Sequence, residues 1–406
     1  MRDWRAVNAL FLVTTILDGI AGGHLTAFTP LMLREIGLES TDIGLWSGLL
    51  YGTMLAIAFP LAPFWGALSE RFSHRLIIAR SQYLAALAYV VTALSGNVWG
   101  LLVARVVLGF TFGHVATVIA AQSLLTPRRH VGKAIATIQS AAPIAASFGP
   151  PLGAALVDHL GLRGLLWLDA ALALAAALLI TFVMPEPEGT RSKVSIVGRT
   201  RQVAGIVCRE PALRWNYIAW FTGQGGRVVV DVYLPVRITQ LSASPASDIG
   251  YVLGVFGALA AVATWLAGRL ADAASATRWL VAAMLLGAVS VLGILTAPSL
   301  WVLAGWAWIR ALPHAAYQTL LYGHLVRVVD PRHQSPVMAM TPVPRNVAAF
   351  VFPTIAAAAS AVSVPAGLGV GAAAYLCTAA AGLMLVRWST APAHPARDAA
   401  QAEPTR

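Results

Sequence analysis

The chain has 406 residues, of which 58% are hydrophobic and 11% are charged, and its formal net charge is +11. A soluble protein cannot bury that much apolar surface, so the composition indicates a membrane protein. The two cysteines, Cys208 and Cys377, exclude a disulfide framework and a thiolate zinc site.

Apolar stretches long enough to cross a bilayer recur along the whole chain. Crossing the hydrocarbon core takes about 20 apolar residues, and continuous rather than alternating apolar character predicts helices. The first stretch follows Arg2 and Arg5 as in a signal peptide, but it is too long for one, so we expect it to be retained. Twelve such stretches cover approximately residues 8–33, 44–69, 76–95, 98–124, 133–158, 163–184, 212–238, 248–268, 279–297, 300–326, 336–361 and 366–387.

The basic residues set the expected orientation. If the N-terminus is cytoplasmic, the outer connections hold only Arg34, Arg163 and Arg237. The remaining loop arginines and lysines then lie on the inner side, which predicts that both termini are cytoplasmic. The net positive charge follows from topology and the lipid surface, so we expect no nucleic-acid partner.

The sequence divides at its one long polar, basic connection, and the parts on either side repeat. "TDIGLWSGLLYG" (41–52) corresponds to "SDIGYVLGVFGA" (247–258), and "TPRRH" (126–130) corresponds to "DPRHQ" (330–334). Matches in the same order predict a duplicated six-helix unit. We therefore expect an all-α membrane protein of twelve transmembrane helices in two six-helix bundles related by a pseudo-two-fold axis. The predicted boundaries are 1–184 and 212–390 for the bundles, 185–211 for a cytoplasmic loop, and 391–406 for a disordered cytoplasmic tail.

The segment "APFWGALSERFSHRLIIARS" (62–81) resembles the signature G-x-L-[AS]-[DE]-R-[FYK]-G-R-[RK] of the major facilitator superfamily. The resemblance implies a cytoplasmic gate: Gly66 would permit close helix crossing, Glu70 and Arg71 would form a charge network, and Arg75 would be its distal basic residue. Ser73 and His74 stand where the family usually has Gly and Arg. Glu70 would face the positive end of a helix that begins near Ser335.

Two further segments resemble proton-coupled members of the superfamily. Arg105 in "ARVVLGFTFG" is similar to a buried arginine of the fourth helix, followed by spaced glycines. "APIAASFGPPLGAAL" (142–156) resembles the fifth-helix antiporter signature that ends G-P-x-x-G-G, through Gly149, Pro150 and Gly153, with alanine at the last position. The segments "LWSGLLYG" (45–52) and "APFWGALSER" (62–71), with Arg345, resemble those of drug/proton antiporters of the multidrug-exporter type.

Charges inside the predicted spans are candidate functional residues, because charged groups in a membrane are costly and usually face an interior path. Arg227 and Asp231 lie at i and i+4, so they share a helical face and can pair. Protonation of Asp231 would break this pair and free Arg227 for another anion. The alternative is a static structural ion pair.

Asp18 is a lone carboxylate in "TTILDGIAGGH". Three roles stay open for it: a proton carrier, an ion-pair partner of Arg105, or a polar residue of the outer vestibule. Arg105, Arg310 and Arg345 do not deprotonate, so we expect them to act as charge platforms or to donate hydrogen bonds between helices.

The remaining polar residues of the spans carry weaker predictions. We expect His24, His114 and His314 to be satisfied hydrogen-bonding residues rather than proton carriers. Asp169 would compensate part of the cavity charge, near the outer face.

The residues together predict secondary active transport. Four embedded arginines against Asp18 and Asp231 give a positive cavity, which favours anionic or zwitterionic solutes. The best interpretation is proton-coupled efflux of a small amphipathic or anionic organic solute by a monomer in the cell inner (plasma) membrane. The alternative is an importer or facilitator of an organic anion. The sequence holds no G-x-x-x-x-G-K-[ST] run and no nucleophile or metal motif, so we expect no enzyme, no cofactor and no metal.

Overall fold

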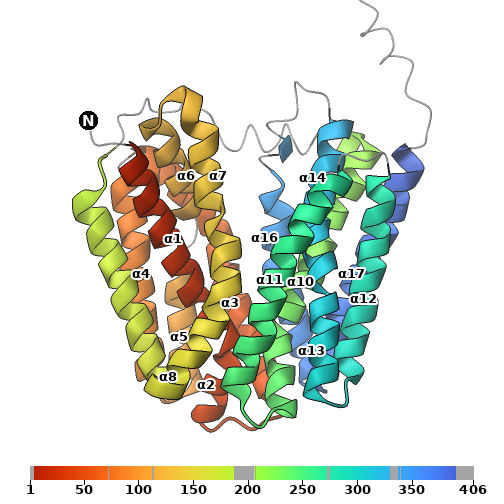
Figure 1. Cartoon of the computed structure of the whole chain (residues 1–406), viewed down its shortest axis with the longest axis horizontal. Coiled ribbons are helices and arrows are strands. Elements are labelled where there is room, and N and C mark those ends of the chain that lie inside the picture. Colours follow the sequence, from red (N-terminus) through yellow and green to blue (C-terminus); the bar gives the residue numbers. More distant parts are fainter. Residues whose placement is uncertain are drawn as a thin grey trace, which may run out of the picture.

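The computed structural model describes residues 4–71, 73–111, 114–186, 205, 207–271, 275–329, 337–338 and 340–389, and for residues 62–71, 114 and 116 it describes the backbone alone. Within these ranges the chain forms helices and no strand. Figure 1 shows the helices in two groups, α1–α8 and α10–α17, which lie side by side with their axes roughly parallel. We call these groups the N-terminal half and the C-terminal half.

The N-terminal half contains several helices that the sequence predicted as single spans but that are interrupted. The predicted span 8–33 is broken at Phe28, and the predicted span 98–124 is broken after Gly109. Pro30 explains the first break, because a proline inside a helix removes a hydrogen bond and crowds the carbonyl four residues earlier. The helices are α1 (Trp4–Ala27), α2 (Thr29–Glu35), α3 (Ile43–Arg71), α4 (His74–Leu94), α5 (Val98–Gly109), α6 (His114–Leu125), η1 (Arg128–His130), α7 (Val131–Gln139) and α8 (Ala141–Val183).

Helix α8 reverses direction at Gly161, where φ is +70° and ψ is 172°. Only glycine adopts this conformation readily. The reversal falls between the predicted spans 133–158 and 163–184, so α8 has a first arm, which contains Pro150 and Pro151, and a second arm, which ends at Val183.

The C-terminal half repeats the interruption seen in α5 and α6. The predicted span 300–326 is broken at Arg310, which joins α13 to α14. Pro313 supplies the reason, because its ring is incompatible with a continuous helix across the carbonyl of Ile309. The helices are α10 (Pro211–Leu241), α11 (Pro245–Ala271), α12 (Ala276–Thr296), α13 (Leu300–Ile309), α14 (Ala311–Val328), α16 (Pro342–Ser360) and α17 (Val364–Ser389).

Seven helical stretches of the described residues are long and apolar enough to cross a membrane. One of them, Arg128–Val183, has 56 residues and contains the reversal at Gly161. Helix α10 is not among the seven, although it has 31 residues, and its embedded charges lower its hydropathy. The count of twelve spans therefore stays a prediction.

The two halves touch along two seams lined by glycine. In the first seam, Gly48 of α3 lies against the carbonyl of Pro353 in α16, where an added Cβ would be 2.8 Å from the oxygen. In the second seam, Gly257 of α11 lies against Ser147 in the first arm of α8, where an added Cβ would be 2.7 Å from Cα. A glycine at such a position permits close approach of the two backbones.

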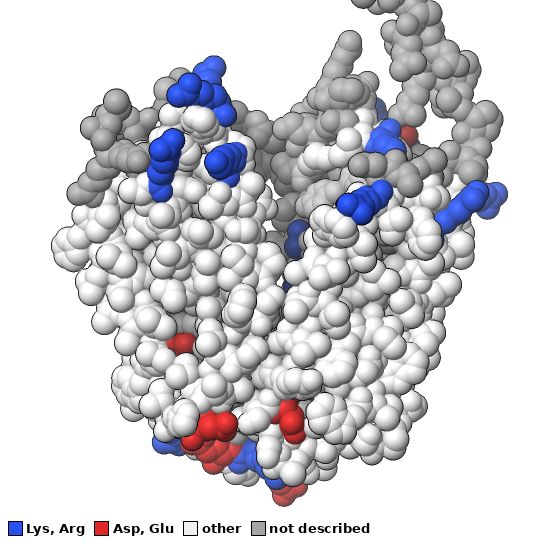
Figure 2. Space-filling model, viewed as in Figure 1, with Lys and Arg blue, Asp and Glu red and all other residues white. Residues whose placement is uncertain are grey.

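Charge separates the two ends of the molecule. Figure 2 shows lysine and arginine side chains gathered at the end where Figure 1 places the N-terminus, whereas the opposite end carries aspartate and glutamate together with some basic side chains. The acidic end includes the ion pair of Arg163 and Glu35, whose Nε and Oε1 atoms are 3.0 Å apart. Figure 2 also shows a groove between the halves, with basic side chains inside it, on the side of the basic end.

Candidate functional site

Asp231 of α10 lies among three potential hydrogen-bond donors. Its Oδ1 accepts a hydrogen bond from Nη2 of Arg310 at 3.0 Å. Its Oδ2 is 3.5 Å from Nε of Arg227, and Nδ1 of His314 is 3.8 Å from Oδ1. The structure therefore brings the i, i+4 pair Arg227–Asp231 together, and it adds two partners from α13–α14. We call these four residues the Asp231 cluster.

The two arginines of the Asp231 cluster differ in exposure. The side chain of Arg310 is fully buried, with 0% relative exposure, whereas that of Arg227 is 29% exposed. The guanidinium of Arg310 also lies over the ring of Phe256, 4.6 Å from its centroid, as in a cation–π contact. Arg310 is thus a fixed partner of Asp231, and Arg227 is the cluster cation that solvent and a solute can reach.

His314 completes the Asp231 cluster one helical turn after Arg310. Its ring makes an edge-on contact with Phe256, with centroids 5.0 Å apart. Two arginines against one aspartate give the cluster an excess of positive charge when His314 is neutral. This local excess agrees in sign with the positive cavity expected from the sequence.

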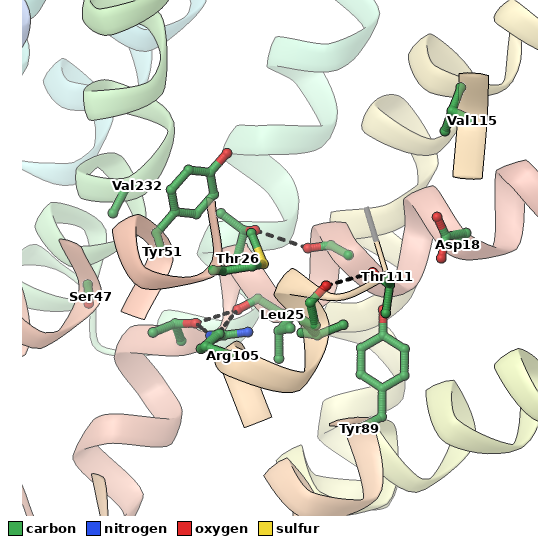
Figure 3. A pocket seen from close by; sticks show the side chains of 14 residues that line it. Asp18, Leu25, Thr26, Ser47, Tyr51, Tyr89, Arg105, Thr111, Val115 and Val232 are labelled. Atoms are coloured by element: carbon green, nitrogen blue, oxygen red, sulfur yellow. Dashed lines mark hydrogen bonds between the residues drawn. The ribbon is translucent and has the colours of Figure 1, made fainter. Parts of the chain in front are cut away.

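A cavity of about 370 Å³ lies mainly among the helices of the N-terminal half, and Val232 of α10 also lines it. It holds both Asp18 and Arg105, and Figure 3 shows them at separate points of the cavity wall. Its lining residues come from α1, α2, α3, α4, α5, the turn after α5, α6 and α10: Asp18, Gly22, Leu25, Thr26, Thr29, Ser47, Tyr51, Met54, Tyr89, Arg105, Leu108, Thr111, Val115 and Val232.

Arg105 links two helices at the cavity. Its Nη2 donates to the hydroxyl of Thr29 and, at 3.3 Å, to the carbonyl oxygen of Leu25. These contacts agree with one of the two roles expected for the buried arginines, the donation of hydrogen bonds between helices. The described hydrogen bonds of Arg105 go to Leu25 of α1 and Thr29 of α2, and the ion pair with Asp18 that the sequence left open stays a prediction.

Tyr51 connects the cavity with the Asp231 cluster. It lines the cavity in α3, and it is near enough to Asp231 and Arg227 for their charges to act on its hydroxyl. Val232, the neighbour of Asp231 in α10, lines the cavity as well. Of the two predicted proton-coupling residues, Asp18 lines the cavity, and Asp231 is the sequence neighbour of the lining residue Val232.

Arg345 lies elsewhere in the C-terminal half. Its guanidinium carbon is 5.5 Å from the ring centroid of Trp220. Trp220 is fully buried and also contacts Tyr317 and Tyr322 edge-on. Arg345 thus belongs to an aromatic group and not, by its described contacts, to the Asp231 cluster.

The predicted cytoplasmic gate is only partly described. The backbone of Gly66, Glu70 and Arg71 forms the end of α3, but the predicted contacts of Glu70 and Arg71 lie outside the described side chains, as does Ser335. Arg75 is described, in the first turn of α4, and its side chain is exposed.

The departures from the signature at Ser73 and His74 have a structural use that the sequence did not reveal. Ser73 is the N-cap of α4, accepting from the amide of Leu76 at 3.0 Å. Its hydroxyl donates to Glu186, just after α8, at 2.5 Å. Glu186 also accepts from the amide of His74 at 2.7 Å, so a carboxylate lies at the positive end of α4.

The antiporter-like residues belong to the first arm of α8, where it packs on α1. An added Cβ on Gly153 would be 2.5 Å from Cδ2 of His24 and 2.6 Å from Cε2 of Phe28, whereas one on Gly149 would be 3.5 Å from Cα of Ile20. Pro150 is buried in the same arm. Gly153 is thus the position that makes room for His24.

Sequence reasoning missed the pair of His24 and Asp169. Nδ1 of His24 lies 3.0 Å from Oδ1 of Asp169, and the side chains are only 3% and 1% exposed. Asp169, which was expected near the outer face, is buried in the second arm of α8. The two residues are 145 positions apart, so no local spacing signals the contact.

Comparison with known proteins agrees with this architecture. The family model described as "Major Facilitator Superfamily" matches residues 10–353. The chain is 24% identical over 308 residues to the multidrug resistance protein MdtG of Salmonella typhi, covering 74% of this chain and 76% of that one. MdtG of Citrobacter koseri is also 24% identical, over 306 residues.

Solved structures share the fold. The crystal structure of a bacterial homologue of the human lysosomal transporter Spinster, inward-facing and occupied, matches with a TM-score of 0.72 at 15% identity, covering 96% of each chain. The human organic anion transporter MFSD10 matches with a TM-score of 0.65 at 19% identity, covering 95% of this chain and all of that one, 100%.

The family match and the MdtG relatives, together with the apolar helices, identify a multi-pass membrane transporter rather than an enzyme. The chain belongs to the Major Facilitator Superfamily. The resemblance drawn from its sequence motifs, including that to multidrug exporters, is thereby confirmed.

Proposed function

We propose that the chain is a proton-coupled antiporter that exports a small amphipathic organic solute by alternating access between its two halves. The relatives named multidrug resistance protein MdtG support efflux. We further propose that the basic end faces the cytoplasm, because basic residues are retained on that side. The glycine seams would then close the outer side, and the groove would open inward.

The observation that carries the proposal is the position of Asp231. It is the one carboxylate among the four residues of its cluster, and it has 29% relative exposure. A proton on Asp231 and a solute group that donates hydrogen bonds to it compete for the same oxygens. Such competition is the thermodynamic condition for antiport, because two ligands that exclude each other are exchanged across the membrane.

Arg227 favours a second candidate function, the movement of an organic anion together with a proton. Protonation of Asp231 weakens its attraction for Arg227, whose Nε is 3.5 Å away, and leaves that arginine free for a solute anion. A hydrogen bond to a charged group contributes about 1.5–3 kcal/mol, so the link between proton and anion would be measurable. Here the two ligands assist each other, which is the condition for co-transport.

The experiment that separates the two functions measures the direction of proton flux. Inside-out vesicles that contain the protein hold an acidic interior, a pH probe records the interior, and cationic dyes and organic anions are added in turn. Release of protons from the interior on addition of a solute supports antiport. Entry of protons with an organic anion supports the second function.

Asp231→Asn is the test variant, and Glu39→Gln, which alters an exposed carboxylate between α2 and α3, is the control. Loss of the proton signal in the first and its retention in the second place the coupling at Asp231. Movement of a radiolabelled solute without any proton signal, equal in both variants, would show a facilitator and overturn both coupled functions.

A further inference from the structure

Both ring nitrogens of His24 face oxygen atoms. Nδ1 lies 3.0 Å from Oδ1 and 3.1 Å from Oδ2 of Asp169, and Nε2 lies 3.0 Å from the carbonyl oxygen of Gly149. His24 comes from α1, and its two partners come from the two arms of α8. The relative exposure of His24 is 2% and that of Asp169 is 1%, so both side chains are shielded from bulk solvent.

Hydrogen-bond donation fixes the number of protons in this group. A carbonyl oxygen only accepts, so Nε2 must carry a hydrogen. An ionised carboxylate also only accepts, so Nδ1 then carries a second hydrogen and the ring is an imidazolium. If Nδ1 is instead bare, the carboxyl of Asp169 must carry that hydrogen. In either arrangement the pair holds one proton more than a neutral imidazole beside an ionised carboxylate.

We propose that His24 and Asp169 form a buried proton-binding site in the N-terminal half, loaded in this conformation and separate from Asp231. Loss of its proton leaves two acceptors facing each other at about hydrogen-bond distance, so one of the two contacts must open. This proposal does not depend on whether protonation of Asp231 is coupled to transport.

The position of the site gives its occupancy a mechanical consequence. The contacts of His24 join α1 to Gly149 in the first arm of α8 and to Asp169 in the second arm. Two residues beyond Gly149, Pro151 packs against Gly254 of α11 in the other half. The proton therefore stabilises α1 against the segment of α8 that forms an inter-half seam, and its release loosens that segment.

Other titratable and charged groups surround the site from the helices packed on it. Asp18 precedes His24 on α1, and Arg105 faces the same region from α5. Tyr89 of α4 is near enough to Asp18, Asp169 and Arg105 for their charges to act on it. Asp18 and Tyr89 line the cavity, so they provide polar groups between the buried pair and a space that a proton can reach.

The test counts protons directly and needs no solute. Protein labelled with 15N-histidine in lipid nanodiscs is studied by NMR at neutral pH, and His24 is assigned by loss of its signals in His24→Gln. Infrared spectroscopy of the same sample records protonated carboxyl groups, and Asp169→Asn identifies the band of Asp169. We expect either two protonated ring nitrogens in His24 or an Asp169-dependent protonated carboxyl band.

Asp169→Ala should leave a His24 ring with a single proton. His159→Gln, which changes an exposed histidine of α8, is the control and should alter neither signal. A His24 ring with one proton at neutral pH, together with no carboxyl band that depends on Asp169, would overturn the proposal. The measurement on the unaltered protein remains decisive if an Asp169 variant fails to fold.

Discussion

Asp231 of α10 accepts a hydrogen bond from Arg310 at the junction of α13 and α14, with 3.0 Å between Oδ1 and Nη2, although the residues are 79 positions apart. The break between the two helices places the guanidinium at this point. The hydrogen bond between Asp231 and Arg310 therefore joins the junction of α13 and α14 to the interior of α10. Its removal should affect both the stability of the protein and the charge of the cavity.

Arg310→Ala should lower stability strongly, because it leaves the Asp231 carboxylate without its nearest partner. Breaking a buried ion pair costs about 3–5 kcal/mol, and because Asp231 is partly exposed we expect a loss of about 3 kcal/mol. The measurement is thermal unfolding of the purified protein in detergent. Restoration of most of the lost stability in the double variant Arg310→Ala, Asp231→Asn would locate the effect in the pair, whereas an unchanged midpoint in Arg310→Ala would contradict it.

Arg227→Gln should act on solute selection rather than on stability. The side chain of Arg227 is 29% exposed, and loss of a charge-assisted hydrogen bond of about 1.5–3 kcal/mol reduces affinity for an anionic solute by about tenfold or more. Binding of organic anions and cationic dyes to the purified protein provides the readout. Arg269→Gln removes one exposed arginine of α11 and is the control; an equal loss in both variants would argue against a specific role.

Ser73→Ala should destabilise the start of α4. The N-cap hydroxyl accepts from the amide of Leu76 and donates to Glu186, and loss of an N-cap costs about 1 kcal/mol. Glu186→Gln should cause a smaller loss, because an amide oxygen still accepts but no charge faces the helix terminus. Thermal midpoints are compared with that of Glu39→Gln, an exposed glutamate. If Ser73→Ala, Glu186→Gln and Glu39→Gln all unfold at the same temperature as the unaltered protein, the N-cap does not stabilise α4.

A contact in the site could be predicted from the sequence when its two residues lie within one helix, and not when they lie far apart along the chain. The pair of Arg227 and Asp231 follows from helical spacing alone, and charges inside apolar spans marked Arg105 and Arg310 as well. The contact of His24 with Asp169 spans 145 positions and depends on how α1 packs on α8. No pattern within one helix contains that information.

The fold was predictable to a similar degree. Apolar length identified the helices, and the repeat anticipated two halves, because both are properties of composition along the chain. Interruptions such as that at Arg310 were missed, since the apolar run continues through them. Pro313 was the available signal, because proline within an apolar run predicts a break.

Gly48→Ala should weaken the seam between α3 and α16. The added Cβ would be 2.8 Å from the carbonyl oxygen of Pro353 and 2.9 Å from Cβ of Ala357, so the helices must separate. Spin labels at cysteines replacing Asp42 and Val362, both exposed near the acidic end, report the distance after Cys208 and Cys377 are changed to serine. We expect longer distances than in Gly305→Ala, where nothing lies within 4 Å of the added Cβ; equal distributions would exclude the seam as a determinant of closure.

Gly153→Ala should displace the imidazole of His24, and Gly149→Ala in the same arm of α8 should not. A Cβ at Gly153 would lie 2.5 Å from Cδ2 of His24 and 2.6 Å from the ring of Phe28, which is closer than carbon atoms approach, whereas the nearest atom to a Cβ at Gly149 is 3.5 Å away. Because His24 holds both arms of α8, its displacement breaks the contact with Asp169. We expect a loss of about 1–3 kcal/mol for overpacking in Gly153→Ala only.

The readouts for this pair of variants are thermal unfolding and the 15N signals of His24. In Gly153→Ala the ring should lose its extra proton at neutral pH together with the stability, while Gly149→Ala should keep both. This joint loss distinguishes the proposed site from simple crowding, which lowers stability without changing the protonation of the ring. An unaltered His24 spectrum in a destabilised Gly153→Ala would show that this glycine serves packing alone.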